Sequence, residues 1–482
     1  MERSEARHCL AARRRAAPLG KGQRCAPLCR HGASAVAPLI LTATVVVPVP
    51  HAVPLGPTTL ALFIAVAVFV ALATMRKAAL GVGVLVVVEP FAFAHVLGPT
   101  TLTLPKAALA GLIAGLVLRR PSLAVLRAPA NRALVGGAAA LVIVDALSII
   151  PAVYLDAALR ETLKALEYFA AFAAAAVAFA DDPDETLVWN AVAVVSALVC
   201  VLALVQEATV APSGFWLHGR IVPRIAGPLE GPNQLAGWLD LMTPLLVARA
   251  LLGKHVWPFA ALATLAVTTD LLALSRSGVV GIVVGVGVIA FLAARVGFAR
   301  RLMYAAPLAI VPLIAVSAIL TFANTGVGNL ANGGAGDLAA RFQIASEQTV
   351  ENGLAPRPVL WKAGLQMFAL DPGLGIGAGN YELLTPLVGL VGVRTHANSL
   401  YVQALAETGL LGFAAILWTI VAAVTTMLRN ARGPLLAGIG AGTIGLAVHE
   451  AYDLLTFYPK VGELWWLLLG IGAGAVALGT RR

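Results

Sequence analysis

Residues 57–77 read PTTLALFIAVAVFVALATMRK, and this uncharged apolar stretch decides the fold. No charge interrupts it before Arg76, so its length is close to the ~20 residues that a helix needs to cross a bilayer. Stretches of this kind recur along most of the chain. Backbone groups in lipid must hydrogen-bond within their own segment, which favours helices. The sequence therefore predicts an all-α fold, a polytopic transmembrane helix bundle.

The composition supports a membrane protein. Hydrophobic residues make up 59% of the 482 residues and charged residues only 12%, whereas soluble domains are roughly half apolar and a quarter charged. The formal net charge of +10 would suggest nucleic acid in a soluble protein. Here the basic residues punctuate apolar stretches, so we expect membrane lipids as partners and no nucleic acid. The cysteines predict neither a disulfide nor a metal site.

Breaks at proline, glycine and charged residues divide the apolar sequence into about 12–14 helices. The candidate segments are residues 36–50, 57–75, 78–97, 105–119, 133–152, 160–180, 187–209, 234–252, 255–273, 277–296, 302–322, 400–427, 433–455 and 462–480. We expect residues 1–33 to form a basic, disordered cytoplasmic tail and residues 34–482 to form one transmembrane domain.

Positive charge predicts the orientation, because Lys and Arg gather in short cytoplasmic loops. With the N-terminal tail inside, nearly every second connection is basic, from Arg76 and Lys77 onward. One inside loop, residues 181–185 with the sequence DDPDE, disagrees, but carboxylates have little weight in orientation. Both termini are then cytoplasmic. The predicted external segments are residues 210–233, 275–277, 449–461 and one large loop, 323–399.

Arginines stand out in the first two external segments. Arg220 and Arg224 precede a turn rich in glycine and proline that reaches Asn233, where a helix begins. The guanidinium fork suits phosphate oxygens, and a helix start adds unpaired N–H groups. Arg276 lies between two apolar stretches, where an arginine is costly unless it is paired or functional. The alternatives are solvated loop arginines for the first pair and a snorkelling interfacial arginine for Arg276.

The large loop and the helix after it carry the remaining candidates. An amphipathic helix is expected from Arg357, followed by a glycine-rich tight turn over residues 371–381, where no preceding strand supports a dinucleotide site. His396 stands at the start of the next apolar helix, either as a general base or as a cap or interfacial residue. His449 and Asp453 are weaker candidates, and the aromatic residues of 452–466 are expected to mark a membrane interface.

Taken in order, these segments resemble the O-antigen ligase and O-antigen polymerase family of bacterial membrane glycosyltransferases. The similarity covers residues 215–415. It rests on residues 224–233, on Ser275 with Arg276, on the stretch from Arg357 to Gly377, and on residues 396–412. Each motif is weak by itself, but four in the same order, alternating with helices, are fairly specific.

The resemblance implies an enzyme that transfers or polymerises a glycan carried on undecaprenyl diphosphate. The acceptor would be a glycan or lipid hydroxyl at the periplasmic face, and neither a metal nor a cofactor would take part. Such enzymes build cell-envelope polysaccharides, lipopolysaccharide among them. By the resemblance, Arg220, Arg224 and Arg276 would bind the diphosphate, and clamping the leaving group makes Arg276 catalytic.

The same resemblance gives His396 the role of activating the acceptor hydroxyl. Counting back from Gly409 and Gly412, the position of the ligase histidine is occupied by Asn398. His396 lies two residues earlier, where relatives with a His-x-His pattern also carry histidine. The supporting residues would be Asn233, Arg357, Asn398 and Ser399.

A polysaccharide transporter or flippase without glycosyl transfer is the alternative function. It would also be polytopic and would use charge within the membrane, as Asp145, Glu89, Glu167 and Asp240 in apolar stretches suggest. Against it, the notable polar residues gather on one face. Ligase and polymerase share a donor and differ in the acceptor, so both remain open, as do the sugar and the oligomeric state.

Overall fold

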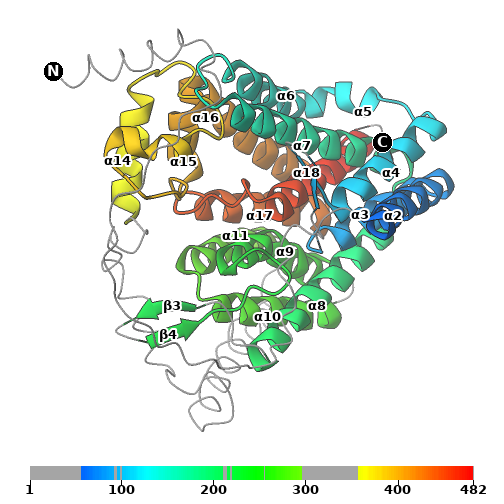
Figure 1. Ribbon diagram of the computed structural model, residues 1–482. Coiled ribbons are helices and arrows are strands. Elements are labelled where there is room, and N and C mark those ends of the chain that lie inside the picture. The colour runs from blue at the N-terminus through cyan, green and yellow to red at the C-terminus, as the bar shows by residue number, and fades with distance from the viewer. Residues whose placement is uncertain are drawn as a thin grey trace. The chain divides into compact units, whose positions relative to one another are not determined.

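The computed structural model describes residues 56–91, 95–97, 100–209, 214–217, 220–253, 256–295 and 356–480. This part of the chain is an all-α bundle, as predicted (Figure 1). Nine helices among the described residues are long and apolar enough to cross a membrane, so the protein is a multi-pass membrane protein. The helices of three turns or more are α2 (Pro57–Arg76), α3 (Ala78–Val88), α4 (Leu104–Arg119), α6 (Arg132–Leu147), α7 (Leu155–Asp181), α8 (Glu185–Thr209), α9 (Pro232–Leu252), α10 (Val256–Ala273), α11 (Arg276–Ala294), α14 (Arg357–Phe368), α16 (Leu400–Arg429), α17 (Pro434–His449) and α18 (Pro459–Gly479).

Short elements connect the long helices. Two are single-turn helices, α5 (Ala124–Arg127) and α15 (Tyr381–Leu384), and two are 3₁₀ helices, η1 (Pro129–Asn131) and η3 (Thr385–Val388). The strands of the described residues form two antiparallel hairpins. The first pairs β1 (His95–Leu97) with β2 (Thr100–Leu102), and the second pairs β3 (Gly214–Leu217) with β4 (Arg220–Pro223).

Each predicted helical segment within the described residues contains a helix. Three helices end five or more residues earlier than predicted. α6 stops at Leu147, shortly before Pro151. α3 stops at Val88 because Pro90 follows, and proline neither donates a backbone hydrogen bond nor fits inside a helix. α17 stops at His449 because the Glu450 carboxylate accepts hydrogen bonds from the N–H groups of Leu455 (3.0 Å) and Thr456 (2.7 Å), which turns the chain. The segments 1–33, 36–50, 302–322 and 323–355 lie outside the described residues.

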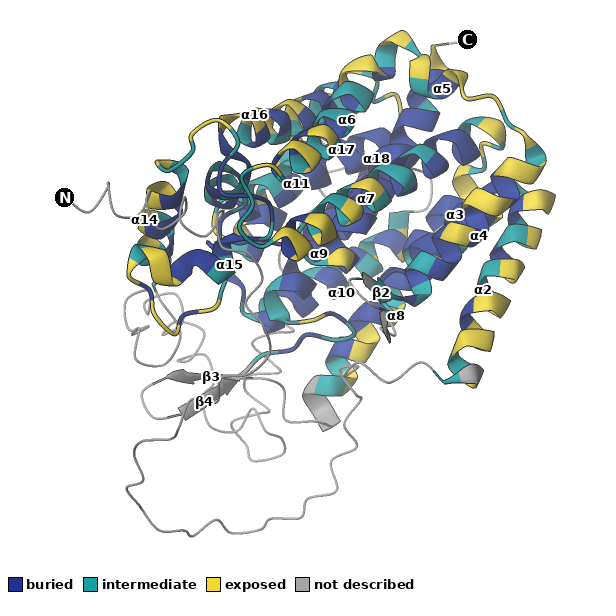
Figure 2. Cartoon of the chain, turned by 45° about the horizontal axis from the view of Figure 1, so that its top comes forward, coloured by how far each residue is buried: buried dark blue, intermediate teal, exposed yellow. Residues whose placement is uncertain are grey.

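The core surrounds two central helices. Nearly every residue of α9 and α18 is buried, and α9 packs with α10, α11 and α17 while α18 packs with α7 (Figure 1). Gly470 of α18 allows the close approach, since a Cβ there would lie 2.3 Å from the Phe172 carbonyl oxygen of α7. The outer faces of α2 and α16 keep large apolar side chains exposed, as a lipid-facing surface requires (Figure 2).

Polar residues gather at two opposite ends of α7. At one end, which we call the ion-pair end, Arg119 pairs with Asp181 (2.6 Å) and Lys77 pairs with Asp184 (2.6 Å). The other end, which we call the arginine end, holds Arg224, Arg276 and Arg357 and the described parts of the four predicted external segments. The acidic loop that disagreed with the charge pattern is thus the partner of two basic loops.

Candidate functional site

Three separate segments of the arginine end meet at Asp453. Arg224 donates from Nη2 to Oδ1 of Asn233 (2.6 Å), and Asn233 donates from Nδ2 to Oδ2 of Asp453 (2.6 Å). Nη2 of Arg357 lies 3.8 Å from the same Asp453 oxygen. The Asp453 side chain is only 7% exposed. Arg357 therefore contacts this buried carboxylate directly and Arg224 reaches it through Asn233, so two arginines are linked to one carboxylate.

Arg224 is held in place from two sides. It follows β4, which begins at Arg220, and its Nε donates to the carbonyl oxygen of Ala273 (2.9 Å), the last residue of α10. Burial lowers the pKa of Arg224 to about 10, with Arg357 acting in the same direction and Asp453 opposing it. A pKa of about 10 leaves the guanidinium charged at neutral pH, so Arg224 is a fixed cation of defined orientation.

Arg276 is the first residue of α11 and lies in the middle of the short turn predicted at residues 275–277. Leu274 adopts a left-handed conformation with φ 53°, and the Ser275 hydroxyl caps the helix by accepting from the Gly278 N–H (3.3 Å). The Arg276 side chain is half-buried and makes neither a hydrogen bond nor an ion pair with any described residue. Its guanidinium is therefore available to an anion.

His396 contacts the external segment 449–461, which also carries Asp453. Its Nδ1 is 2.9 Å from Oε1 of Glu382, which belongs to α15, and its ring packs against Phe457 with 4.1 Å between centroids. The close contact with His396 holds the pKa of Glu382 below its usual range, although burial acts in the opposite direction. A carboxylate on Nδ1 fixes the orientation of the ring and leaves Nε2 to face a substrate.

Tyr458 lies between the histidine and the arginines. It lies beside Gln234, the neighbour of Asn233, and its ring meets the His396 ring edge-on at 6.1 Å between centroids. Burial raises the pKa of Tyr458 to about 12, so its hydroxyl is neutral at physiological pH. The segment from Asp453 to Tyr458 thus contacts the arginine cluster at one end and His396 at the other.

Asn398 and Ser399 shape the start of α16. Asn398 has φ 50°, a left-handed conformation that Asn tolerates better than most residues. Ser399 is buried and caps the helix by accepting from the Val402 N–H (3.5 Å). The N–H of Leu400 points to the carbonyl oxygens of Glu450 (2.9 Å) and Asp453 (3.0 Å). Both residues therefore position the His396 segment on the loop that carries Asp453.

Gly409 explains the glycine motif further along α16. It interrupts the helix with φ 65°, and a Cβ there would lie 2.4 Å from the Gly373 carbonyl oxygen. The Leu410 N–H, freed by this kink, donates to the carbonyl oxygen of Pro372 (2.9 Å). The glycine-rich segment after α14 is thus a tight turn, as predicted, and it hydrogen-bonds to the middle of α16.

Sequence reasoning found the arginines and His396 but gave their partners little weight. Asp453 was a weak candidate, Glu382 had no role, and Tyr458 counted as an interfacial aromatic residue. A second buried pair was also missed, in which His449 Nδ1 lies 2.6 Å from Oδ2 of Asp240. The only available signal was the excess of polar residues in the segment 449–461, which ends the apolar α17.

Comparison with known proteins identifies the same region. Residues 247–417 match a family model described as O-antigen ligase. The match runs from α9 into α16, so it contains Arg276, Arg357 and His396 and leaves out Arg224 and Asp453. No curated protein matches the chain.

Proposed function

We propose, from the match of residues 247–417 to an O-antigen ligase family model, that this chain transfers or polymerises a glycan carried on undecaprenyl diphosphate. The match supports a role in cell-surface polysaccharide biosynthesis. The observation that carries the proposal is the surplus of positive charge at the arginine end. Arg357 contacts Asp453 directly and Arg224 reaches it through Asn233, while Arg276 has no partner among the described residues.

The arginines suit the donor. A diphosphate is an anion with several acceptor oxygens, and planar guanidinium groups bind such oxygens in pairs. Negative charge grows on the diphosphate as the glycosidic bond breaks, so cations placed there stabilise the transition state more than the ground state. We assign this role to Arg276 and Arg224, with Arg220 and Arg357 as further candidates.

His396 suits the acceptor. Its free Nε2 takes the proton of the acceptor hydroxyl while the hydroxyl oxygen bonds to the anomeric carbon of the donor sugar. The bond between that carbon and the diphosphate oxygen breaks at the same time, and undecaprenyl diphosphate leaves with the electron pair. Glu382, 2.9 Å from Nδ1, stabilises the imidazolium that forms. Atoms and charge balance without a metal ion or a nucleotide sugar.

The orientation of the bundle belongs to the same proposal. The basic loops with Lys77 and Arg119 lie at the ion-pair end, opposite the candidate site. Because basic loops stay cytoplasmic, this arrangement supports a site at the periplasmic face of the inner membrane, with both termini in the cytoplasm.

Transport without transfer remains the second candidate, since carboxylates lie within the bundle. Glu89 is 1% exposed and both its oxygens lack a hydrogen-bond partner. Two of the other acidic residues have structural partners, because Asp240 pairs with His449 (2.6 Å) and Glu167 pairs with Lys106 (3.1 Å). Glu89 alone is a weaker basis for transport than the arginine end is for transfer.

An in-vitro transfer assay tests the proposal. Purified protein receives an undecaprenyl-diphosphate-linked glycan and a set of candidate acceptors, and the wild type is compared with Arg276→Ala, His396→Ala and the control Arg429→Ala, whose side chain is exposed at the far end of α16. We expect product from the wild type and the control, and a loss of about 10²-fold or more in each of the other two variants. Absence of product with every acceptor, together with glycan movement across liposomes, would favour transport. Normal turnover of the His396 variant would remove its assigned role.

A further inference from the structure

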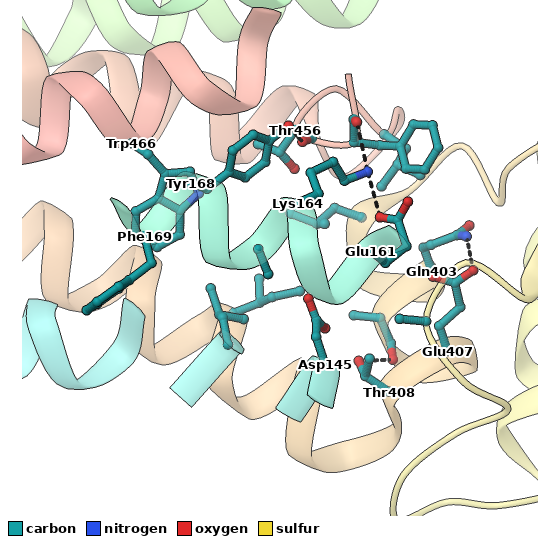
Figure 3. Close-up of a pocket in the computed structure, with 18 of the residues that line it drawn as sticks. Asp145, Glu161, Lys164, Tyr168, Phe169, Gln403, Glu407, Thr408, Thr456 and Trp466 are labelled. Carbon is teal, nitrogen blue, oxygen red and sulfur yellow. Dashed lines mark hydrogen bonds and ion pairs between the residues drawn. The ribbon is translucent and has the colours of Figure 1, made fainter. Parts of the chain in front are cut away.

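A cavity of about 160 Å³ lies beside His396 within the bundle (Figure 3). Its walls come from α6, α7, α16, α18 and the segment before α18. Phe457 lines the cavity, and its ring also contacts the His396 ring. The cavity and the candidate general base are therefore neighbours that share one aromatic wall.

One part of the wall is polar. Lys164 pairs with Glu161 (2.6 Å), and Gln403 donates to Glu407 (2.8 Å). The Asp145 carboxylate makes no hydrogen bond or ion pair with any described residue, and Figure 3 shows it among the side chains that line the cavity. Asp145 therefore retains its full capacity to accept hydrogen bonds from a ligand.

Another part of the wall is aromatic. Tyr168 and Phe169 of α7 and Trp465 and Trp466 of α18 line the cavity with Phe457. Pockets that combine aromatic surface with a few polar groups bind ligands that have both an apolar face and hydrogen-bonding edges. A sugar ring has this character, because its C–H bonds form an apolar face while its hydroxyl groups surround the edge.

The cavity offers no free cation to a phosphate. The one ammonium group among its lining residues, that of Lys164, is already paired with Glu161. A diphosphate is bound by cationic donors, so this lining disfavours it. The diphosphate of the donor belongs with the arginines, and the cavity suits an uncharged or amino-bearing sugar. Its volume holds on the order of ten waters, enough for a single sugar ring.

We propose that this cavity is a saccharide subsite that binds one unphosphorylated sugar ring of the acceptor. Asp145 accepts hydrogen bonds from the sugar hydroxyls, and the aromatic wall packs against the face of the ring. Phe457 lies between this ring and His396, so the subsite holds a ring next to the one whose hydroxyl reacts. The assignment to the acceptor rests on the proposed glycosyl transfer, whereas binding of sugar in the cavity does not require it.

Direct binding tests the subsite without a donor. Full-length protein is titrated with unphosphorylated monosaccharides, neutral and amino-bearing, while tryptophan fluorescence is recorded, because Trp465 and Trp466 line the cavity. We expect a saturable change with at least one sugar and about tenfold weaker binding in Asp145→Asn. Asp156→Asn is the matched control, since its carboxylate is 71% exposed on α7 and does not line the cavity. Binding in this control should equal that of the wild type.

A second variant separates loss of the site from loss of the fold. Ala165→Leu fills the cavity and leaves Asp145 unchanged, and it should also weaken sugar binding while thermal unfolding shows an intact protein. No saturable response to any sugar, or equal binding by Asp145→Asn, would overturn the subsite. So would competition by a short polyprenyl diphosphate, which would assign the cavity to the donor lipid. Arg276→Ala should retain sugar binding, and sugar binding without transfer by the wild type would reject the proposed function alone.

Discussion

The two polar ends of the bundle differ in how their charged side chains are paired. At the ion-pair end, each of two cations has its own carboxylate, Arg119 with Asp181 and Lys77 with Asp184. At the arginine end, Arg357 contacts Asp453 directly and Arg224 reaches it through Asn233, while Arg276 has no partner among the described residues. The arginine end therefore keeps cationic groups that an anionic ligand could pair with.

The causes of the pKa shifts follow the same division. The hydrogen bond with Lys77 is the main reason why the pKa of Asp184 lies below its ordinary value. Burial is the main reason why the pKa of Arg224 falls to about 10. The pairs at the ion-pair end are partly exposed, so solvent screens their charges and they add little to stability. The arginine end instead keeps desolvated cations, which is costly unless they serve binding.

Membrane orientation gives the largest expected difference between the two ends. We expect a cysteine at Lys362, exposed on α14, to react with an impermeant maleimide in intact cells, and a cysteine at Glu185 to react only after lysis. The four native cysteines are replaced in both variants to remove background labelling. The reverse pattern would place the arginine end in the cytoplasm and end the proposed periplasmic chemistry.

Replacement of arginine by lysine should lower transfer activity at the arginine end and leave it nearly unchanged at the ion-pair end. Lysine keeps the charge, but its single ammonium cannot reproduce the fork by which Arg224 reaches both Ala273 and Asn233. We expect Arg224→Lys to lower kcat/KM for the lipid-linked donor about 100-fold, the scale of one lost transition-state donor. Arg119→Lys, the control at the ion-pair end, should stay within about threefold of the wild type. Equal effects at both ends would mean that Arg224 only holds the structure.

Sequence predicts the local part of this fold. An apolar stretch and its proline or glycine breaks are read from neighbouring residues, so the helices were placed close to their observed positions. Gly409 was likewise visible as part of a motif, but the reason for it, a kink against the Gly373 carbonyl, needs the packed structure.

Partnerships across the chain are not local and escape such reasoning. Asn233 and Asp453 are 220 positions apart, and Lys77 and Asp184 are 107 apart. The acidic loop at residues 181–185 therefore looks like an exception to the charge pattern. In the fold, its Asp181 and Asp184 pair with the basic residues Arg119 and Lys77 that make up the pattern. Asp453 looked peripheral for the same reason, because only the fold brings it between two arginines.

Stability should also distinguish the ends when one carboxylate is replaced by an amide. Asp453 accepts from Asn233 through Oδ2 and from the Leu454 N–H through Oδ1 (2.9 Å). Asn at this position leaves one of these N–H groups facing another N–H, and a buried unsatisfied donor costs about 1–3 kcal/mol. We expect Asp453→Asn to lower the unfolding free energy by about 2 kcal/mol and Asp181→Asn by less than about 1 kcal/mol. Equal unfolding midpoints for the two variants would show that the hydrogen bonds accepted by Asp453 do not stabilise the arginine end.

The smallest expected effect concerns Glu382, the partner of His396 at the arginine end. Its pKa is lowered, so the carboxylate is fully ionised above its ordinary pKa of about 4.3, and its support for His396 is lost only as the pH falls through the lowered value. A neutral Gln stabilises the imidazolium less, and we expect Glu382→Gln to transfer about tenfold more slowly near pH 7.

The pH dependence of this deficit is the diagnostic measurement. The ratio of wild-type to Glu382→Gln rates should stay constant from about pH 8 to about pH 5 and shrink only as the pH falls through the lowered pKa of Glu382, where the wild-type carboxylate also becomes neutral. Glu185→Gln, at the ion-pair end, should show a ratio near one at every pH. A Glu382 deficit that persists undiminished below the lowered pKa would show that the residue acts through its shape, because protonation removes the charge and leaves the shape unchanged.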